Sequence, residues 1–87
     1  MEVEFDRSKD ATNMAKHGLS LADAANFDMA IAVIETDNRA DYGEVRFRAF
    51  ARVDGEGRCL VFSLRGAVVR AISYRRAHEK EMRRYDK

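Results

Sequence analysis

The middle of the chain alternates apolar and polar residues, a pattern that predicts antiparallel strands. Over residues 44–53 every second residue is apolar, which is the period of a strand with one buried face. Residues 54–57 are glycines and acids in alternation and predict a tight hairpin connection. Residues 59–64 predict the returning strand, with Leu60, Phe62 and Leu64 on one face, and a second turn leads to a strand over residues 68–73.

The first part of the chain predicts a short strand followed by two short helices. Residues 2–6 alternate as a strand, and residues 8–17 place Ala11, Met14 and Ala15 at helical spacing.

End signals support both helices. Asp6 or Ser8 is suited to cap the first helix, and Gly18 fits the left-handed position that ends a helix. Ser20 then caps a second helix over residues 21–27.

These elements predict an α+β fold in one domain, residues 1–87. The apolar run at 30–34 predicts a further strand, 35–43 an exposed loop, and 77–85 a final helix. We expect an antiparallel sheet packed by the N-terminal helices on one face, with the C-terminal helix directly after the last strand.

Composition and charge indicate a small folded domain and the kind of partner it binds. The chain is 46% hydrophobic and 36% charged, as in a small folded domain. Its net charge of +1 is distributed unevenly along the chain. Residues 65–87 hold eight Lys/Arg and three acids, a net charge of +5, whereas residues 1–64 hold eight Lys/Arg and twelve acids, a net charge of −4. The basic end predicts an anionic partner.

Several features predict a cytoplasmic protein. The N-terminus is acidic and lacks the apolar segment of a signal peptide. No apolar run approaches the roughly 20 residues that span a bilayer, so no membrane partner is expected. The single cysteine, Cys59, excludes an intrachain disulfide and reads as a core residue. One Cys and two distant His do not form a metal signature, and no cofactor motif is present.

Arginine is the remaining candidate for chemistry. The guanidinium group is always charged, and its fork matches two phosphate oxygens. Arg46 and Arg48 lie on the polar face of one predicted strand, Arg65 lies at a turn, and Arg75 and Arg76 lie at the joint between the last strand and helix.

These arginines also have a purely structural interpretation, as solvated charges that form surface pairs. Arg46 with Glu44 and Arg48 with Glu35 are the pairs that the sequence suggests.

Two further residues each have two interpretations. His17 is either a general base, because its ordinary pKa lies near working pH, or a helix-terminal cation beside Lys16. Tyr85 either contacts RNA and orients a phosphate, or packs with its hydroxyl in water.

Taken together, these residues resemble those of BrnT-type toxins. The match runs from residue 4 to residue 85 in the family's order. The matching segments are Glu4-Phe5-Asp6, Lys9, Asn13 and Lys16-His17-Gly18 at the front, Glu44-x-Arg46-Phe47 in the middle, and Ile72-Ser73-x-Arg75-Arg76-Ala77, Glu81 and Tyr85 at the end.

The resemblance implies the toxin of a type II toxin–antitoxin pair, with a RelE-like fold and a metal-independent endoribonuclease activity that inhibits translation and growth. The implied partners are an RNA substrate and a BrnA-like ribbon-helix-helix antitoxin, through which alone the toxin would reach operator DNA.

The resemblance also implies roles for residues. The implied catalytic set is Arg75, Arg76, Arg46, Tyr85 and His17, and the implied RNA-binding set is Arg65, Lys16 and Arg48. Family members often carry an acid before the arginine of the second turn, where Leu64 stands here, so the identity of the base is open. The alternative function is a non-catalytic module that binds RNA or protein through its basic C-terminal surface.

Overall fold

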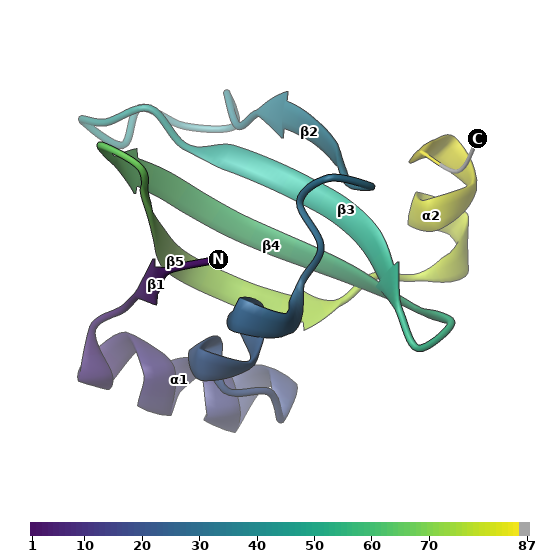
Figure 1. Cartoon of the computed structure of the whole chain (residues 1–87), viewed down its shortest axis with the longest axis horizontal. Helices are drawn as coiled ribbons and strands as arrows, with labels where there is room; N and C mark the ends of the chain where they lie inside the picture. Colours follow the sequence, from purple (N-terminus) through teal and green to yellow (C-terminus); the bar gives the residue numbers. More distant parts are fainter. Residues whose placement is uncertain (86–87) are drawn as a thin grey trace.

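The structure is a computed structural model that describes residues 1–85 (Figure 1). Its elements, in chain order, are β1 (Val3–Glu4), α1 (Arg7–His17), the 3₁₀ helix η1 (Leu21–Asn26), β2 (Val33–Thr36), β3 (Phe47–Val53), β4 (Glu56–Arg65), β5 (Val68–Arg76) and α2 (Glu79–Tyr85).

All five strands form one sheet in the order β1-β5-β4-β3-β2. The strands β2 to β5 pair antiparallel, and β1 adds a short parallel pair at Val69 and Arg70 of β5. The predicted α+β class and the antiparallel sheet are therefore confirmed, while the likeness to RelE stays a prediction. None of the helices in residues 1–85 is long and apolar enough to cross a membrane.

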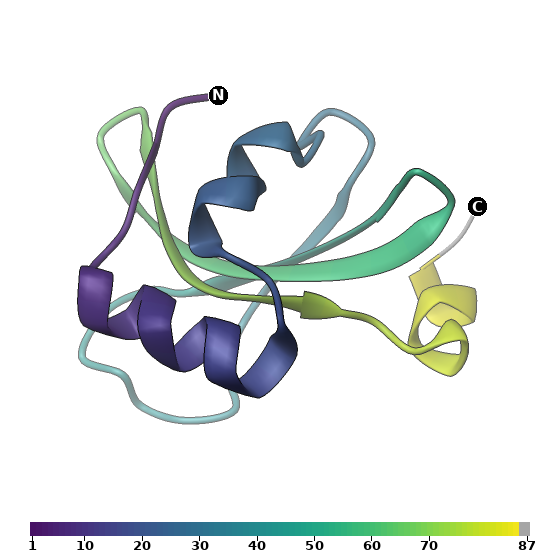
Figure 2. The ribbon, with the colours of Figure 1, turned by 90° about the horizontal axis from the view of Figure 1, so that it is seen from below.

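One face of the sheet carries the larger core. Strand alternation brings Ala49, Leu60 and Tyr74 to this face. The buried residues Leu21 and Ala24 of η1 pack against them. Figure 2 shows η1 on one side of the strands, with α1 running beside β5. The helix η1 thus packs on one face of the sheet as the sequence predicts, whereas α1 lies along the edge of β5.

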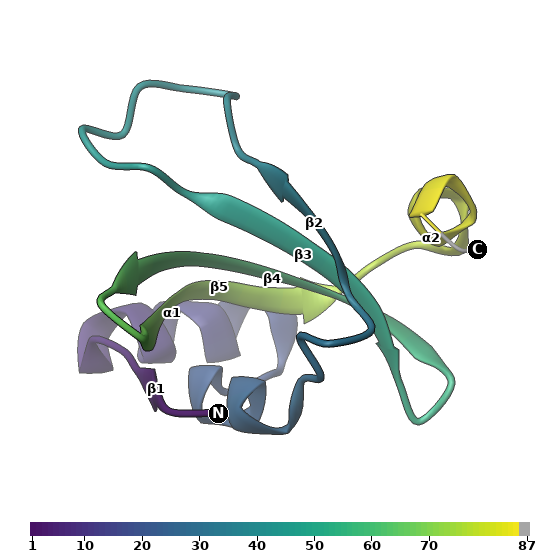
Figure 3. The same cartoon turned by 45° about the horizontal axis from the view of Figure 1, so that its top comes forward.

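The opposite face holds a second core, which corrects the expectation that helices cover one face only. Here Phe50, Cys59 and Val61 are buried together with Met82 of α2. The last helix is therefore on the other side from η1, and Figure 3 shows it beyond the end of β5 and apart from α1. Its approach requires Gly57, where an added Cβ would lie only 2.5 Å from Cγ of Met82.

The ends of α1 follow the predicted signals. The carboxylate of Asp6 accepts hydrogen bonds from the backbone of Ser8 and Lys9, and Gly18 closes the helix in the left-handed conformation with φ of 68°. The apolar residues at helical spacing do not form a buried stripe, however. Met14 is 48% exposed, and the residue that α1 buries is Asn13, at 4%.

Element bounds differ from the prediction mainly in the sheet. The strand expected at 30–34 begins at Val33, after a turn, and β5 continues three residues beyond its expected end to Arg76. The last helix begins at Glu79 rather than at residue 77. The extension of β5 matters for function, because it places Arg75 and Arg76 in a strand, where successive side chains point in opposite directions.

Candidate functional site

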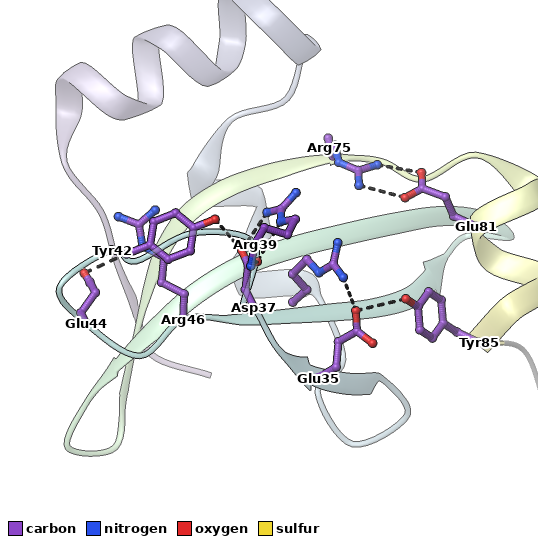
Figure 4. Close-up of polar contacts among 10 residues, drawn as sticks. Glu35, Asp37, Arg39, Tyr42, Glu44, Arg46, Arg75, Glu81 and Tyr85 are labelled. Carbon is purple, nitrogen blue, oxygen red and sulfur yellow. Dashed lines mark hydrogen bonds and ion pairs between the residues drawn. The ribbon is translucent and has the colours of Figure 1, made fainter.

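A polar network joins β2, β3 and α2 on the face that α2 covers (Figure 4). Arg48 and Glu35 are cross-strand partners, and the guanidinium group of Arg48 donates to Oε1 of Glu35. The hydroxyl of Tyr85 donates to the same oxygen over 3.1 Å. The ring of Tyr85 stacks on Phe50 with 4.1 Å between centroids. The ring of Tyr85 therefore packs, as one interpretation holds, but its hydroxyl is bound to Glu35, and a contact with RNA stays a prediction.

Arg75 lies beside this network and holds α2 through Glu81. Its two terminal nitrogens donate to the two carboxylate oxygens over 2.9 and 3.0 Å. The backbone N–H of His78 donates to the same carboxylate over 3.1 Å. The hydrogen bonds from Arg75 lower the pKa of Glu81 to about 2, and Glu81 in turn raises the pKa of Arg75. Glu81 is therefore ionised at neutral pH and is a weak base.

A third arginine enters from the loop between β2 and β3. Asp37 is buried and accepts from Nε and Nη2 of Arg39 over 2.8 and 2.7 Å, and these bonds hold the pKa of Asp37 well below its usual range. The hydroxyl of Tyr42 also reaches Asp37, over 3.4 Å. Arg46 lies over the Tyr42 ring, 4.2 Å from its centroid. Figure 4 shows these side chains on the same face as Arg75.

Sequence reasoning missed the roles of Asp37, Arg39 and Tyr42, because it treated residues 35–43 as an exposed loop. An Asp followed two residues later by Arg is a signal of local pairing, but nothing in the sequence shows that Asp37 is buried.

The side chains of Arg75 and Arg76 lie on opposite sides of the sheet. Arg76 donates to Oε1 of Glu56 over 2.9 Å and to the backbone carbonyl of His17 over 3.1 Å. It therefore ties β5 to the end of α1, and the two guanidinium groups do not converge on one point. Arg65 lies at the turn between β4 and β5, 3.4 Å from Glu4, at the other end of β5 from Arg75 and α2.

His17 and Lys16 lie beside β5 rather than over the sheet. They line a cleft between α1 and β5 of about 350 Å³. Burial, and then the positive charges of Lys16 and Arg75, lower the pKa of His17 below its ordinary value of 6.5. His17 is thus mainly neutral at pH 7, in the state that accepts a proton.

The arginines of the sheet and its loops are ion-paired among the residues that the structure describes. Both pairs of the structural interpretation are present: Arg46 lies 4.0 Å from Glu44, and Arg48 contacts Glu35. Such pairing fixes the guanidinium groups in place, yet each carries five N–H donors. Within residues 1–85, Arg75 uses only some of them, since its hydrogen bonds all involve the two terminal nitrogens.

The Arg75–Glu81 pair predicts a change in acid stability. The pKa of Glu81 is lower in the folded protein, about 2 against 4.5, so the pair stabilises the fold above pH 4.5 and this contribution is lost as pH falls toward 2. We expect Glu81→Gln to be less stable than wild type at pH 7 and to approach it near pH 2. Urea unfolding at a series of pH values measures this, and a difference independent of pH would contradict it.

Comparison with known proteins adds an independent line of evidence. A family model described as "Ribonuclease toxin, BrnT, of type II toxin-antitoxin system" matches residues 5–81. The crystal structure of the Brucella abortus ribonuclease toxin, BrnT, is similar to this chain with a TM-score of 0.74 and 30% sequence identity. The alignment covers 91% of this chain and 99% of that one. No curated protein matches.

Proposed function

The chain belongs to the BrnT family of ribonuclease toxins of type II toxin–antitoxin systems, and from this we propose that it cleaves RNA internally without a metal ion. One observation carries the proposal: β3, β5 and α2 bring Arg48, Arg75 and Tyr85 to one face of the sheet, each held by a carboxylate. Fixed cations of this kind stabilise charge that develops in a transition state.

The reaction that fits these residues is attack by an RNA 2′-hydroxyl on the adjacent phosphorus. The O2′–P bond forms, the P–O5′ bond breaks, and the products are a 2′,3′-cyclic phosphate and a 5′-hydroxyl. His17 takes the proton of the 2′-hydroxyl, and the departing 5′-oxygen takes a proton from water. Arg75 and Arg48 neutralise the pentacovalent phosphorane, and Arg46 assists them.

The remaining residues of the predicted site act around this centre. Tyr85 positions the substrate through its hydroxyl. Arg76 is a positioning residue, because its bond to the His17 carbonyl fixes the end of α1 against β5. Lys16 and Arg65 bind RNA away from the scissile phosphate.

The partner in this proposal is a cognate BrnA-like antitoxin with a ribbon-helix-helix region, through which the pair binds operator DNA. Free toxin would inhibit translation and arrest growth. Expression of the chain alone in a bacterial host, with and without the neighbouring open reading frame, tests this. Growth arrest that the neighbour relieves is expected, and unaffected growth with a folded product would contradict it.

The products of cleavage test the chemistry. Purified protein incubated with RNA and a chelator should yield fragments with 2′,3′-cyclic phosphate ends. An RNA with 2′-deoxyribose at the cleavage position should stay intact, since it lacks the nucleophile. Ends that carry a 3′-hydroxyl, or a requirement for added metal, would contradict the mechanism.

The pH dependence tests the role of His17. The base must be unprotonated, so the cleavage rate should rise with pH and level off below pH 6.5, because the pKa of His17 is lowered. Below that pKa the rate should fall about tenfold per pH unit. His17→Gln should lower the plateau rate and remove the fall in rate at low pH, whereas His78→Gln should keep this fall. If the fall persists in His17→Gln, the base is another group.

The ion pairs favour one alternative, a module that binds RNA without cutting it. If the arginines serve only to hold the fold, the protein will bind RNA and release no fragments in the experiment above.

A further inference from the structure

The cations that are unpaired among residues 1–85 lie on the two α-helices, not on the sheet. Among the residues that the structure describes, ion pairs involve the arginines of the strands and loops. The lysines and arginines without one are Arg7, Lys9 and Lys16 on α1 and Lys80, Arg83 and Arg84 on α2. A cation without a carboxylate partner gives up no existing ion pair when it binds phosphate.

Some of these cations line the cleft between α1 and β5. Lys9 and Lys16 are seven residues apart and so lie on the same face of α1, and both face the cleft with Thr12 between them. Its other wall is Ile72 and Ser73 of β5. Because β1 pairs with β5 only at positions 69 and 70, this stretch of the strand edge is not covered by a neighbouring strand.

A second cleft, of about 420 Å³, lies between β3 and α2. Lys80 and Arg84 line it from one face of α2, and Arg48 lines it from the sheet. The stacked rings of Phe50 and Tyr85 form part of its wall. Cations beside an aromatic surface are the combination that proteins use to hold single-stranded nucleic acid, since bases stack and phosphates pair with the cations.

Arg75 lies between the two clefts. It pairs with Glu81, which lines the β3–α2 cleft. Its charge also lowers the pKa of His17, which lines the α1–β5 cleft. Figure 4 shows Arg75 on β5 with α1 on one side and α2 on the other.

We propose that RNA crosses the protein as a single strand, from the α1–β5 cleft over Arg75 into the β3–α2 cleft. Lys9 holds a phosphate on one side of the scissile bond, and Lys80 and Arg84 hold a phosphate on the other side. This inference rests on the proposed ribonuclease function and extends it to the path of the substrate. The scissile phosphate lies at Arg75, and the nucleotide that follows the path into the β3–α2 cleft lies against Tyr85.

Two matched pairs of variants test this path. Lys9→Gln and Arg7→Gln each remove one unpaired charge from α1, but of the two residues only Lys9 lines the α1–β5 cleft. Arg84→Gln and Arg83→Gln do the same on α2, where of the two residues only Arg84 lines the β3–α2 cleft. The measurement is binding of a 2′-O-methyl oligonucleotide, which lacks the attacking hydroxyl, by fluorescence anisotropy at several salt concentrations.

We expect Lys9→Gln and Arg84→Gln each to weaken binding roughly three- to tenfold. Each should also reduce the slope of log K against log salt by about 0.7, the value for one phosphate of a single strand. Arg7→Gln and Arg83→Gln should leave the slope unchanged. With a dinucleotide, whose single phosphate lies at Arg75 and which carries no flanking phosphate for Lys9 or Arg84, all four variants should bind alike.

These measurements distinguish a wrong RNA path from a wrong assignment of the ribonuclease function. If each variant matches its control on the long oligonucleotide while cleavable RNA is still cut, the path is wrong and the ribonuclease stands. If only the α1 pair or only the α2 pair differs, the strand does not cross Arg75 and the path is likewise overturned. If the cleft variants lose affinity but wild type releases no fragments, the path holds and the catalytic function fails.

Discussion

Replacing Arg75 with Ala is expected to lower the rate of RNA cleavage about 100-fold, which corresponds to about 3 kcal/mol of transition-state stabilisation. Arg75 is the cation that lies between the two clefts, and Glu81 holds it in a fixed orientation. Because the phosphorane carries more charge than the ground-state phosphate, the loss should fall on kcat more than on KM. Single-turnover cleavage of a labelled RNA, with 3′ ends mapped, measures it.

Two controls separate chemistry from folding. Arg75→Ala leaves Glu81 without its bidentate partner. The free energy of unfolding of Arg75→Ala must therefore be compared with that of Glu81→Gln, which breaks the same pair but keeps the arginine. Glu81→Gln should lose less activity than Arg75→Ala, because the cation remains although its orientation is less fixed. Arg75→Lys keeps the charge without the bidentate geometry and should recover only part of the rate.

The neighbouring arginine provides the sharpest comparison. Arg76 binds Glu56 and the His17 carbonyl, on the other side of the strand from Arg75. Arg76→Ala should therefore change cleavage less than Arg75→Ala, through the position of His17 alone. Equal cleavage by wild type and Arg75→Ala would contradict the proposed catalytic site. A larger effect of Arg76→Ala would indicate that the catalytic site lies on the other side of the sheet.

The sequence predicted the sheet better than the site. The alternation over residues 44–53 places Arg48 and Phe50 on one face and Ala49 on the other, as the two cores require. Periodicity of this kind fixes the direction of side chains, because a shift of one residue would expose the whole apolar set. It therefore also located the arginine-bearing face correctly.

Partners across the chain could not be read from the sequence. Tyr85 meets Glu35, fifty positions away, and nothing local indicates this contact. Arg75 and Arg76 both belong to the implied catalytic set, and their adjacency in the sequence does not show that their side chains lie on opposite sides of the sheet. Their separation follows from the length of β5, and strand bounds are the least certain part of a pattern-based prediction.

The helix α1 shows a different limit. Its apolar residues stand at helical spacing, which predicted the helix but not where it lies. The helix lies beside β5, where an unpaired strand edge needs hydrogen bonds more than apolar cover. Nδ2 of Asn13 donates to the carbonyls of Tyr74 and Leu19 over 2.7 and 2.8 Å, and its Oδ1 accepts from the N–H of Tyr74 over 3.0 Å. The side-chain amide thus takes the place of a neighbouring strand.

This role predicts a large loss of stability for Asn13→Leu. The substitution would leave three backbone groups of Leu19 and Tyr74 without partners, and each buried unpaired group costs roughly 1–3 kcal/mol. Because solvent relieves part of this, we expect the free energy of unfolding to fall by about 3 kcal/mol. The melting temperature should fall by roughly 12–24 °C, since a domain of this size shifts about 4–8 °C per kcal/mol. Urea and thermal unfolding measure both quantities.

Thr12→Ala is the matched control for Asn13→Leu. Thr12 is the preceding residue of α1 and is exposed, and within residues 1–85 its hydroxyl bonds only to the carbonyl of Ser8 in the same helix. Its replacement should change stability by less than about 0.5 kcal/mol. If Asn13→Leu cost no more than Thr12→Ala, the Tyr74 edge of β5 would be satisfied without the amide. The placement of α1, and with it of His17 and the α1–β5 cleft, would then depend on Arg76 and apolar packing instead.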